Sequence, residues 1–555
     1  MKGMILRIIF AVCLCVSAYL GHAQSEPYNT RQLACGLSQP WEIKFGPDGW
    51  LWVTEAFSYQ LSRVDPITGN TEMMLDLSSK KNFLNYGAAA TWPQGGLQGF
   101  AFHPDFNNNP YVYIGYVYQF DSCITATGSC FFKTRIARYN YDTTTKVFSN
   151  ETIVTDAIPG SNDHNAGRLV IGPAGGSSNF LFYSVGDMGA GHLSNGSRPH
   201  RGQQPAIWEG KILRFNLTAD GDAGPNAWIP NDNPFNAGVG QNAVWSLGHR
   251  NPQGLAFAPD GTLYEAEHGP YSDDEINIIK PAYNYGFPLI VGYTDSNYDG
   301  SKAGIGSGIP AITSEFANRS AIQSSYSYSD PIFSLFPGTK TEVSTLYNND
   351  LNGTQPPNYS LYYPSSAASG IEHYSSGAIP GWQNSLLIAT LKGGVVYRLK
   401  LSADGQSVVG DTISYFRGQG RFRDIAVSSD GKKIYVSVDS FGSMKGIGAT
   451  WATPPPNKGC IMEFDFSAIA SVGTVQHANG ILLYPNPAHG SFTLQLPEGV
   501  KAANVRIANM PGSVVYSGRI ANNASVVDLK GLPAGIYTVS VISDRQTWHS
   551  SLTIR

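Results

Sequence analysis

The chain has 555 residues, too many for one ordinary domain but enough for one large repeat fold and a small second domain. With 61 glycines, 34 prolines and 30 tyrosines but only 14% charged residues, the composition favours a turn-rich all-β protein over a helical one. The formal net charge of −4 and an isoelectric point near 6.3 indicate no broad basic surface, which argues against nucleic acid as a partner.

The first 24 residues have the features of a secretory signal peptide. Lys2 and Arg7 accompany an apolar run, and small residues follow up to Gln24, where we place the cleavage site. No later apolar run approaches the length of a membrane span. The sequence therefore predicts an exported protein without a transmembrane span, either secreted or held at the cell surface.

Four cysteines follow the predicted signal peptide, an even number that permits two disulfides in an exported chain. Cys123 and Cys130 flank a short glycine-containing loop, so a bridge between them could close a hairpin. Cys35 and Cys460 lie near the two ends of the large domain, where a bridge would fix its closure. Buried free thiols are the alternative for this second pair.

One pattern recurs along residues 25–467: a Pro-Asp-Gly-like turn or its equivalent, followed by a strand of aromatic and β-branched residues. Its six copies begin at Phe45, Phe102, Ile171, Phe257, Gly381 and Val427. Six such units at irregular spacing predict a six-bladed β-propeller with insertions. The gap of about residues 285–374 is rich in Ser, Tyr and Pro and is predicted to form long loops over one face. An array of β-sandwiches is the alternative, but it does not explain why polar motifs recur beside the same strand of each unit.

The pattern changes at residues 468–479, which have the composition of a linker. Residues 480–555 then alternate short strands with Gly/Pro turns and predict a small Ig-like β-sandwich. The segments YPNP from Tyr484, GSVVY from Gly512 and LPAGIY from Leu532 resemble the C-terminal sorting domain of the type IX secretion system. That resemblance implies export across an outer membrane by the type IX machinery, usually with removal of this domain. A carbohydrate-binding or purely structural sandwich is the alternative.

Residues 247–277 combine a cationic loop, a strand pair and an acidic loop. His249, Arg250 and Asn251 lie on the first loop and can donate hydrogen bonds to an anionic or carbonyl-bearing ligand. The string LAFAPDGTLYEAE predicts two strands joined by an Asp-Gly turn, and the acidic run SDDE supplies hard oxygen ligands of the kind that calcium takes. The segment suggests a site for an anionic cofactor and a divalent cation. A hairpin with a solvated loop at each end is the alternative.

Further polar residues suit catalysis or anion binding. His164 lies in the tight loop GSNDHNAGRL before a predicted strand, and an imidazole can take a proton near neutral pH, although such a histidine is often structural. Asp187 ends another predicted strand, where a simple turn aspartate is the alternative. Arg421 and Arg423 are two positions apart on a predicted strand, so their side chains point the same way and would face one ligand. A surface arginine pair is the alternative there.

The strings GHRNPQGLAF and EHGPYSDDEIN resemble the glucose/sorbosone dehydrogenase family, in particular its soluble quinoprotein members, the PQQ- and calcium-dependent aldose dehydrogenases. The strings GLQGFAFHPDF and DHNAGRLVIGP support the same resemblance, which covers about residues 30–465. It implies a six-bladed propeller that oxidises an aldose such as glucose at C1 to the lactone. Hydride would pass to calcium-bound PQQ, and the electrons would then go to an external acceptor.

The resemblance also implies roles for individual residues. His164 matches the general base, and Asp187 matches the carboxylate that orients it and stabilises its protonated form. Arg250 and Asn251 match the residues that reach the quinone oxygens. Gln94, in a glycine-rich loop, matches a glutamine that contacts the sugar.

PQQ carries three carboxylates, so its anchoring calls for arginine and lysine side chains. By the resemblance, the further cofactor-binding residues are Ser365, Lys392, Arg421 and Arg423. The backbone carbonyls of Gly269 and Pro270 match those that hold the catalytic calcium, a Lewis acid toward the quinone. A second, structural calcium site is matched by Asp274, Glu275, Tyr285 through its backbone, and Asp295. An acidic loop exposed to water is the alternative for that site.

The chain departs from the family pattern at the mouth of the expected pocket. His192, which we expect to contact the substrate, stands where better-known members have a glutamine. Tyr363-Pro364-Ser365 replaces a Trp-Pro-Thr segment, Gly393 replaces an arginine, and a cysteine pair expected near Tyr359 is missing. These departures leave two alternatives open: a dehydrogenase of the same fold for another sugar-derived alcohol or aldehyde, and a non-catalytic propeller that binds glycans or proteins at the cell surface.

Overall fold

The structure, a computed structural model, describes residues 22–23, 27–83, 92–125, 128–173, 175–192, 195–236, 240–355, 363–444, 455–467, 481–496, 500–509, 513–521, 524–533, 535–543 and 547–554. The chain forms two compact units, residues 1–470 and 471–555. Apart from residues 22–23, the predicted signal peptide lies outside the described residues, and so does the predicted linker at 468–479. The predicted domain boundaries therefore stay predictions.

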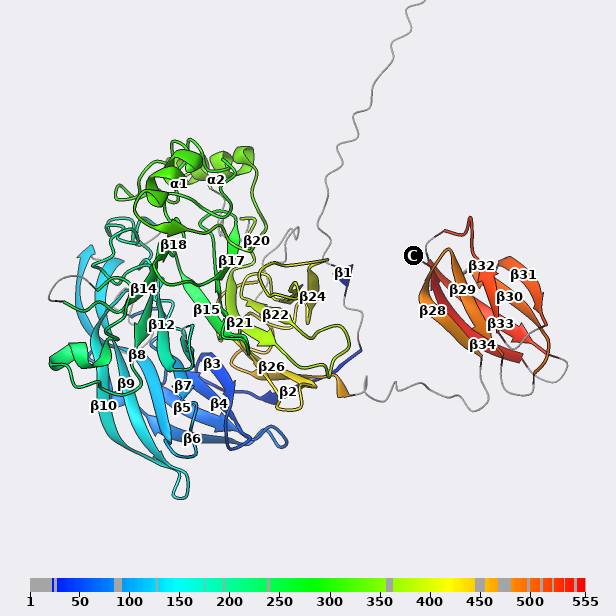
Figure 1. Cartoon of the computed structure of the whole chain (residues 1–555), viewed down its shortest axis with the longest axis horizontal. Helices are drawn as coiled ribbons and strands as arrows, with labels where there is room; N and C mark the ends of the chain where they lie inside the picture. Colours follow the sequence, from blue (N-terminus) through cyan, green and yellow to red (C-terminus); the bar gives the residue numbers. More distant parts are fainter. Residues whose placement is uncertain are drawn as a thin grey trace, which may run out of the picture. The chain divides into compact units, whose positions relative to one another are not determined.

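The described strands of the first unit form six sheets, four of which have four strands (Figure 1). These four sheets follow chain order except that β2, from near the start of the unit, joins the last sheet. Their strands are β3 (Pro40–Phe45), β4 (Leu51–Glu55), β5 (Gln60–Val64) and β6 (Thr71–Asp76); β7 (Leu97–Phe102), β8 (Tyr111–Thr125), β9 (Gly128–Asp142) and β10 (Val147–Gly160); β15 (Pro252–Phe257), β16 (Leu263–Glu267), β17 (Asp274–Ile278) and β20 (Phe333–Leu335); and β25 (Phe422–Val427), β26 (Lys433–Val438), β27 (Ile461–Asp465) and β2 (Asn29–Ala34).

The other two sheets carry additional edge strands. One contains β11 (Leu169–Pro173), β12 (Asn179–Val185), β13 (Lys211–Phe215), β14 (Val244–Leu247), β18 (Tyr283–Asn284) and β19 (Ser327–Tyr328). The other contains β21 (Ala368–Tyr374), β22 (Ser385–Thr390), β23 (Val396–Lys400), β24 (Ile413–Tyr415) and β1 (His22–Ala23). Strands such as β4, β13 and β22 are buried along their whole length, because each sheet packs between neighbouring sheets. The chain is therefore nearly all-β, as its composition predicts.

The inner strands of the six sheets touch one another in chain order. Contacts run from β3 to β7, β11, β15, β21 and β25, and β25 contacts β3 again, so the contacts run round a ring. Strand β2 completes the sheet of β25, β26 and β27 by pairing with β27, which joins the start of the unit to its end. Cys35 is disulfide-bonded to Cys460 beside this pairing, and Cys123 is bonded to Cys130 across the tip of the β8–β9 hairpin. Both predicted disulfides are confirmed.

A buried ionic network connects the inner strands. The Arg168 guanidinium, just before β11, contacts Asp424 of β25 at 2.6 Å and Glu42 of β3 at 3.6 Å. Its Nε donates to the backbone oxygen of Gln253 on β15 at 3.0 Å. Glu42 in turn accepts a backbone N–H of β7, and Asp424 accepts one of β3. Charged side chains with this little exposure remain ionised only when they are paired, so the network ties the inner strands together.

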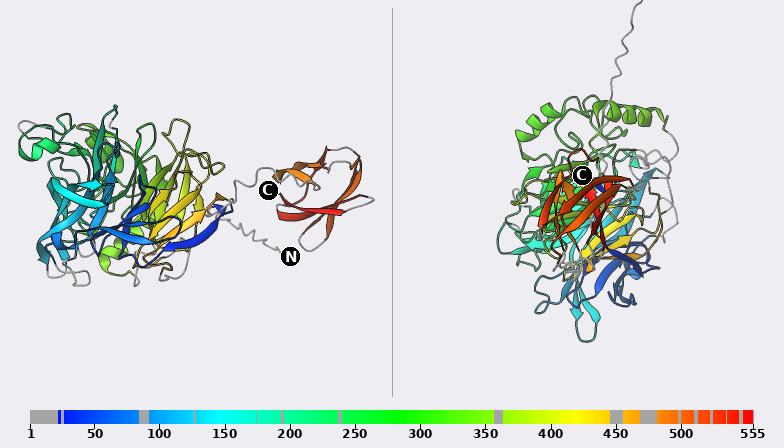
Figure 2. Two further views of the ribbon diagram at one scale, coloured as in Figure 1. Left: turned by 90° about the horizontal axis from the view of Figure 1, so that it is seen from below. Right: turned by 90° about the vertical axis from the view of Figure 1, so that its right-hand side faces the viewer.

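The region of residues 285–374 contains two helices, α1 (Glu315–Gln323) and α2 (Lys340–Asn352), on the same side of the first unit (Figures 1 and 2). The prediction of long loops fits residues 285–314, which have no helix or named strand, but it is wrong where the two helices form. Ser314 caps α1, and Thr339 with Glu342 forms a reciprocal capping box at the start of α2. The spacing TKTE was a readable helix signal inside the Ser- and Tyr-rich segment. Within the described residues, no helix has the length and hydrophobicity to cross a membrane.

The second unit is a β-structure of seven described strands, in the order β31-β30-β33-β34-β28-β29-β32. Their bounds are β28 (Leu482–His489), β29 (Ser491–Gln495), β30 (Ala503–Asn509), β31 (Val514–Ile520), β32 (Ala524–Asp528), β33 (Gly535–Ile542) and β34 (Thr547–Ile554). Strand β30 alternates buried and exposed residues, and Val505 and Ile507 enter the unit's apolar core. An Ig-like topology stays a prediction.

We expect Arg168→Met to lower the free energy of unfolding of the first unit by about 3–5 kcal/mol, because Asp424 and Glu42 would stay buried without their cation. Calorimetric unfolding of the full chain measures this as a lower midpoint of the first unit's transition. The matched control is Lys80→Met, which removes the partly exposed ion pair with Glu151 and should cost about 1 kcal/mol or less. Equal, small effects of both variants would contradict a role for the network in holding the ring.

Candidate active site

Three loops bring His164, Asp187 and Arg250 together at one end of the inner strands. His164 Nδ1 lies 2.7 Å from Asp187 Oδ1, and the backbone N–H of Asp187 donates to the backbone oxygen of Arg250 at 2.6 Å. Gly186 is the residue that allows this approach, since a Cβ there would lie 1.9 Å from the backbone oxygen of His164. His164 has a φ of 50°, a left-handed conformation that is rare for a non-glycine residue and is held here by the surrounding contacts.

The Asp187 carboxylate is buried and ionised. Burial alone would raise its pKa, but attraction to His164, the hydrogen bond from that ring, and the nearby His200 ring and Arg250 guanidinium together lower the pKa below its usual range. An ionised Asp187 fixes the orientation of the His164 ring and stabilises its protonated form. The pair therefore has the geometry and charge of a general base with its orienting carboxylate.

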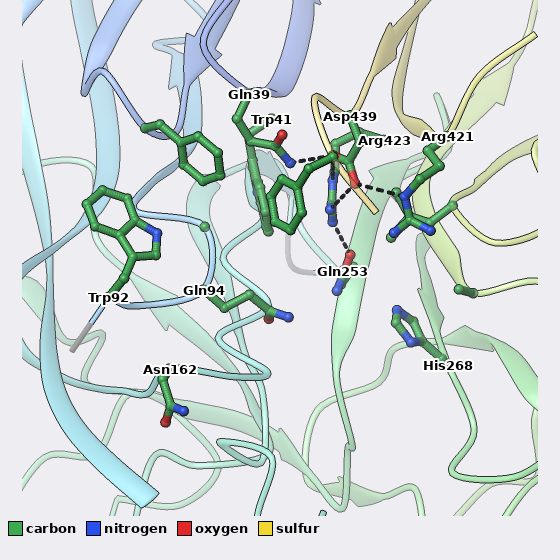
Figure 3. Close-up of a pocket in the computed structure, with 15 residues that line it drawn as sticks. Gln39, Trp41, Trp92, Gln94, Asn162, Gln253, His268, Arg421, Arg423 and Asp439 are labelled. Atoms are coloured by element: carbon green, nitrogen blue, oxygen red, sulfur yellow. Dashed lines mark hydrogen bonds and ion pairs between the residues drawn. The ribbon is translucent and has the colours of Figure 1, made fainter. Parts of the chain in front are cut away.

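A cavity of about 360 Å³ reaches the loop of His164, because its lining includes Asn162 and Gln94, and Gln94 bonds to Asp163 (Figure 3). At one end its wall carries Arg421 and Arg423, both contacting Asp439: Arg423 makes two hydrogen bonds of 2.9 and 2.8 Å, and Arg421 Nε lies 3.6 Å away. Arg423 also donates to Gln253 Oε1 at 2.7 Å. Four aromatic residues also line the cavity: Trp41, Phe57, Trp92 and Phe441, and Trp41 lies under Arg423 at 4.1 Å. Gln94 and Asn162 add amides, and in Figure 3 Trp92 and Asn162 lie on the side away from Arg421. The cavity thus combines cationic and aromatic lining.

Three of the four cationic residues predicted for the site, Arg250, Lys392 and Arg423, act on His268, which lines the cavity. Burial lowers the pKa of His268 well below its usual value, and the positive groups of Arg250, His164, Arg423 and Lys392 lower it further. Arg250 Nη1 also donates to the backbone oxygen of His268 at 3.1 Å. Four side chains from distant parts of the sequence therefore act electrostatically on one imidazole. The sequence analysis gave His268 no role, although it lies inside the string that carries the resemblance.

His164, Arg250 and Lys392 are more than nine-tenths buried and stand behind the residues that line the cavity. Lys392 Nζ donates to the backbone oxygen of Tyr363 at 2.7 Å. The Asn251 side-chain oxygen accepts from the backbone N–H of Ala166, so it ties the His164 loop to the Arg250 loop. These contacts hold the polar groups in place before any ligand binds.

The predicted substrate contacts lie on either side of His164. Gln94 donates to Asp163 at 2.9 Å, which places its amide beside the His164 loop and in the cavity wall. The His192 ring lies 5.9 Å from that of His164. Burial lowers the pKa of His192 well below its usual value, and Arg250 lowers it further, so this ring is neutral at physiological pH. Both residues are thus near the base, as expected for substrate contacts.

The residues predicted for calcium have different surroundings. Asp274 accepts hydrogen bonds from Ser365 and Ser366 and from the backbone N–H of Gly269, which links it to the Gly269-Pro270 turn. Glu275, the next residue on β17, accepts from Gly292 N–H and from Asn277. Adjacent strand residues point to opposite faces, so these two carboxylates meet different partners. Tyr285 bonds through its backbone N–H to Leu247, and its ring stacks on His249 at 4.7 Å.

Asp295 belongs to a carboxylate cluster that the sequence analysis missed. Burial raises the pKa of Asp295, and the nearby charges of Asp330 and Asp299 raise it further. Burial also raises the pKa of Glu315 to about 8, although its carboxylate accepts backbone N–H groups at 3.3 and 2.7 Å. These acids meet only in the fold, because the helix that begins with Glu315 returns beside the Asp295 loop. Among the described residues, one group of three histidine or acidic side chains brings its ligand atoms within 4.8 Å of one another, and it consists of His249, Glu265 and Glu267.

The residues present fit an anionic cofactor and a hard cation. Arg250 Nε and Asn251 Nδ2 are buried and, within the described residues, have no hydrogen-bond partner, so both could donate to a ligand. Guanidinium and ammonium groups suit carboxylates, and the acidic cluster around Asp295 and Glu315 suits calcium. Sequence reasoning missed Asp439, which contacts both cavity arginines. It also missed Gln253, although the string GHRNPQGL that contains this residue could have indicated it.

The family model "Glucose / Sorbosone dehydrogenase" matches residues 37–333 and 320–445, and the model "Secretion system C-terminal sorting domain" matches residues 482–555. Quinoprotein glucose dehydrogenase B of Acinetobacter calcoaceticus is 31% identical over 80% of this chain and 92% of its own length. Aldose sugar dehydrogenase YliI of Escherichia coli is 28% identical over 78% of this chain and 95% of its own length.

Solved structures share the fold of the first unit. The PQQ-bound form of aldose sugar dehydrogenase from Streptomyces coelicolor is 24% identical, covers 80% of this chain and 99% of its own chain, and has a TM-score of 0.50. The apo form of soluble aldose sugar dehydrogenase from Escherichia coli is also 24% identical, covers 79% of this chain and 99% of its own, and has a TM-score of 0.51. At this level of identity the likeness concerns the fold alone.

We expect calcium to raise the unfolding midpoint of the first unit more at pH 8.5 than at pH 6. Burial raises the pKa of Glu315 to about 8. Without a cation, the contribution of Glu315 to the free energy of unfolding is fully present below its unfolded-state pKa of about 4.5. This contribution is lost as the pH rises through the folded-state pKa. A bound cation offsets that loss, by about 2–3 kcal/mol at 100 times the dissociation constant.

Calorimetry in EDTA and in calcium, at both pH values, measures this difference. Glu315→Gln should remove most of the pH-dependent part of the calcium effect, whereas Asp121→Asn, at an exposed position, should leave it unchanged. A calcium effect that is absent, or the same at both pH values in the wild type, would count against a calcium site at this cluster.

Proposed function

Because the chain belongs to the glucose/sorbosone dehydrogenase family, we propose that it is an exported, PQQ- and calcium-dependent dehydrogenase that oxidises an aldose such as glucose at C1 to the lactone. The observation that carries the proposal is the His164–Asp187 pair at 2.7 Å, near a cavity in which three of the predicted cations act on His268. The names of the relatives, a quinoprotein glucose dehydrogenase and an aldose sugar dehydrogenase, support the same activity.

In this proposal the propeller has six blades, and the inner strands β3, β7, β11, β15, β21 and β25 surround its axis. Six sheets among the described strands, and inner-strand contacts that return from β25 to β3, support it. The functional loops then lie at one end of the axis, where His164, Arg250 and Arg423 can face a common ligand.

His164 takes the proton of the C1 hydroxyl, and Asp187 stabilises the imidazolium that forms. Asp187 stays ionised and buried, so the positive charge on the ring is neutralised without solvent. Gln94 and His192, on either side of the base, orient the sugar hydroxyls. The aromatic lining of the cavity, which includes Phe57 and Phe441, suits the carbon-bound hydrogens on one face of a pyranose.

Arg250, Asn251, Ser365, Lys392, Arg421 and Arg423 would hold PQQ, and the carbonyls of Gly269 and Pro270 would hold the catalytic calcium. When bound, PQQ supplies the two-electron acceptor and calcium polarises its carbonyl group. Asp274 fixes both Ser365 and Gly269 by hydrogen bonds, so it positions the two binding segments relative to each other. Glu275, Tyr285 and Asp295 are proposed for a structural calcium site, to which Glu315 adds a carboxylate; the Asp274 side chain, predicted for the same site, points to the opposite face of β17.

Export is proposed to use the signal peptide at residues 1–24 and the type IX secretion system. The match of residues 482–555 to a secretion sorting domain supports this route, which delivers the first unit to the cell surface or the medium. The electrons of the reaction then pass to an acceptor outside the cell.

We expect His164→Ala to lower kcat for dye-coupled glucose oxidation by about 100- to 10,000-fold, because the hydroxyl proton loses its acceptor. The purified protein, loaded with PQQ and calcium, reduces the dye in the assay. His103→Ala, which removes a half-buried histidine next to Asp105, serves as the control and should keep full turnover. Unchanged turnover of His164→Ala would dismiss His164 as the base.

We expect Arg423→Gln to weaken PQQ binding by about 10- to 100-fold, since it removes a buried positive charge from the cavity wall, worth about 1.4–2.8 kcal/mol toward a carboxylate. Absorbance titration of the apoprotein with PQQ measures the affinity. Arg319→Gln, on α1, is the matched control and should not change it. A protein that shows no spectral change with PQQ would instead support the alternative of a non-catalytic propeller. Normal PQQ binding with turnover only on other sugars or aldehydes would identify a different substrate.

A further inference from the structure

The two oxygens of the Asp187 carboxylate differ in their contacts. Oδ1 belongs to the His164–Asp187 pair, whereas Oδ2 makes no hydrogen bond to His164. Oδ1 contacts His164 Nδ1 at 2.7 Å and accepts the backbone N–H of Gly189 at 2.9 Å. Oδ2 is buried and has no hydrogen-bond partner within the described residues. A buried carboxylate oxygen without a donor is costly, so the group nearest to it influences both the charge and the orientation of Asp187.

That group is the imidazole of His200, whose Nε2 lies 3.7 Å from Asp187 Oδ2. His200 Nε2 is also buried without a hydrogen-bond partner in the described part of the chain. His200 Nδ1 accepts the backbone N–H of Gly202 at 3.3 Å. An accepting Nδ1 carries no proton, so the proton of the neutral ring is on Nε2 and faces Asp187. At the distance between His200 Nε2 and Asp187 Oδ2, the N–H group acts on the carboxylate as a dipole near a charge. Such contacts often shorten when a catalytic complex forms.

The His200 ring is held in this orientation by its own loop. Its centroid lies 5.3 Å from the ring of Phe287. A Cβ on Gly202 would lie 2.6 Å from His200 Cε1, so only glycine fits beneath the ring. The backbone oxygen of Gly202 accepts the buried Lys211 ammonium at 2.7 Å, which fixes the turn. The ring is therefore placed by the fold and not by a ligand.

We propose that His200 is a positioning residue for the His164–Asp187 pair: its Nε2–H stabilises the charge on Asp187 Oδ2 and keeps Oδ1 aimed at His164. The proposal rests on the proposed function, in which His164 is the base. It extends the pair to a line of three groups, with one carboxylate between two imidazoles. His200 acts through Asp187 and does not contact the substrate.

The charged groups around His164, Asp187 and His200 determine in which direction the loss of His200 shifts the protonation of His164. Asp187 faces His164, His200 and Arg250, and His200 faces Asp187, Lys211, Arg250 and His164. Burial lowers the pKa of His200 to about 4, against the attraction of Asp187, so the ring is neutral at neutral pH and serves as an N–H dipole. Removing that dipole leaves more of the Asp187 charge to attract the proton on His164. The base then stays protonated to a higher pH.

We expect His200→Phe to lower kcat about tenfold with little change in KM, and to move the acid limb of the kcat/KM profile up by about one pH unit. His200→Gln places an amide N–H near the position of Nε2 and should restore most of both quantities. His373→Phe, which removes a histidine of β21 bonded to Asn384, is the control and should leave the profile in place. If His200→Phe does not fold, His200→Asn replaces it, because its shorter amide does not reach Asp187.

A second measurement needs neither PQQ nor sugar. In proton–nitrogen spectra of the apoprotein with labelled histidines, the His164 Nδ1–H resonance reports the hydrogen bond to Asp187, and it should shift in His200→Phe and return in His200→Gln. An unchanged resonance together with an unchanged pH profile would overturn the role of His200. A wild type that oxidises no sugar would overturn the proposed function, while the spectra would still decide whether His200 acts on the pair.

Discussion

The contact between Arg168 and Asp424 is the constraint on which both the ring and the site depend. Arg168 lies four positions after His164, Asp424 follows Arg423 directly, and Gln253, whose backbone oxygen accepts Arg168 Nε, lies two positions after Asn251. One buried guanidinium therefore fixes the backbone beside the base loop, the cavity arginines and the Arg250–Asn251 loop at once. Because charged groups in a dry interior tolerate little displacement, these loops keep their relative positions without help from a ligand.

Paired buried charges also order the side chains of the cavity wall. Arg421 and Arg423 share the carboxylate of Asp439, and Arg423 also lies 4.1 Å from the ring of Trp41 and bonds to Gln253. Two guanidiniums and one carboxylate leave a net positive charge of one, held in fixed orientations. An anionic ligand that binds beside these arginines meets donors that need no reordering, which lowers the entropic cost of binding. Asp439 lowers the affinity of the two arginines for an anionic ligand. It also keeps both side chains ordered when no ligand is bound.

Local patterns in the sequence predicted much of the fold and the polar core of the site. The all-β composition, the repeated turn-and-strand units and both disulfides are present in the structure, and His164 meets Asp187 as the family resemblance implied. The two helices between residues 285 and 374 were not predicted, because the Ser- and Tyr-rich composition indicates loops. The capping residues Thr339 and Glu342 are the local signal for α2. Glu315, Asp439 and His200 could not be predicted, since each acquires its partner only when loops far apart in sequence meet in the folded ring.

The mouth of the cavity differs physically from its core. Phe57 and Phe441 stack at 5.5 Å, and Phe57 meets Trp92 edge-on at 5.7 Å, so contacts between rings order this part of the cavity wall. Arg168 and Asp424 are instead buried and held by charge, so a change at either would disturb the loops of His164, Arg250 and Arg423 together. Motifs from the constrained core thus identify the family, whereas His192 and Ser365, near the predicted mouth of the cavity, are positions where the chain departs from the family pattern.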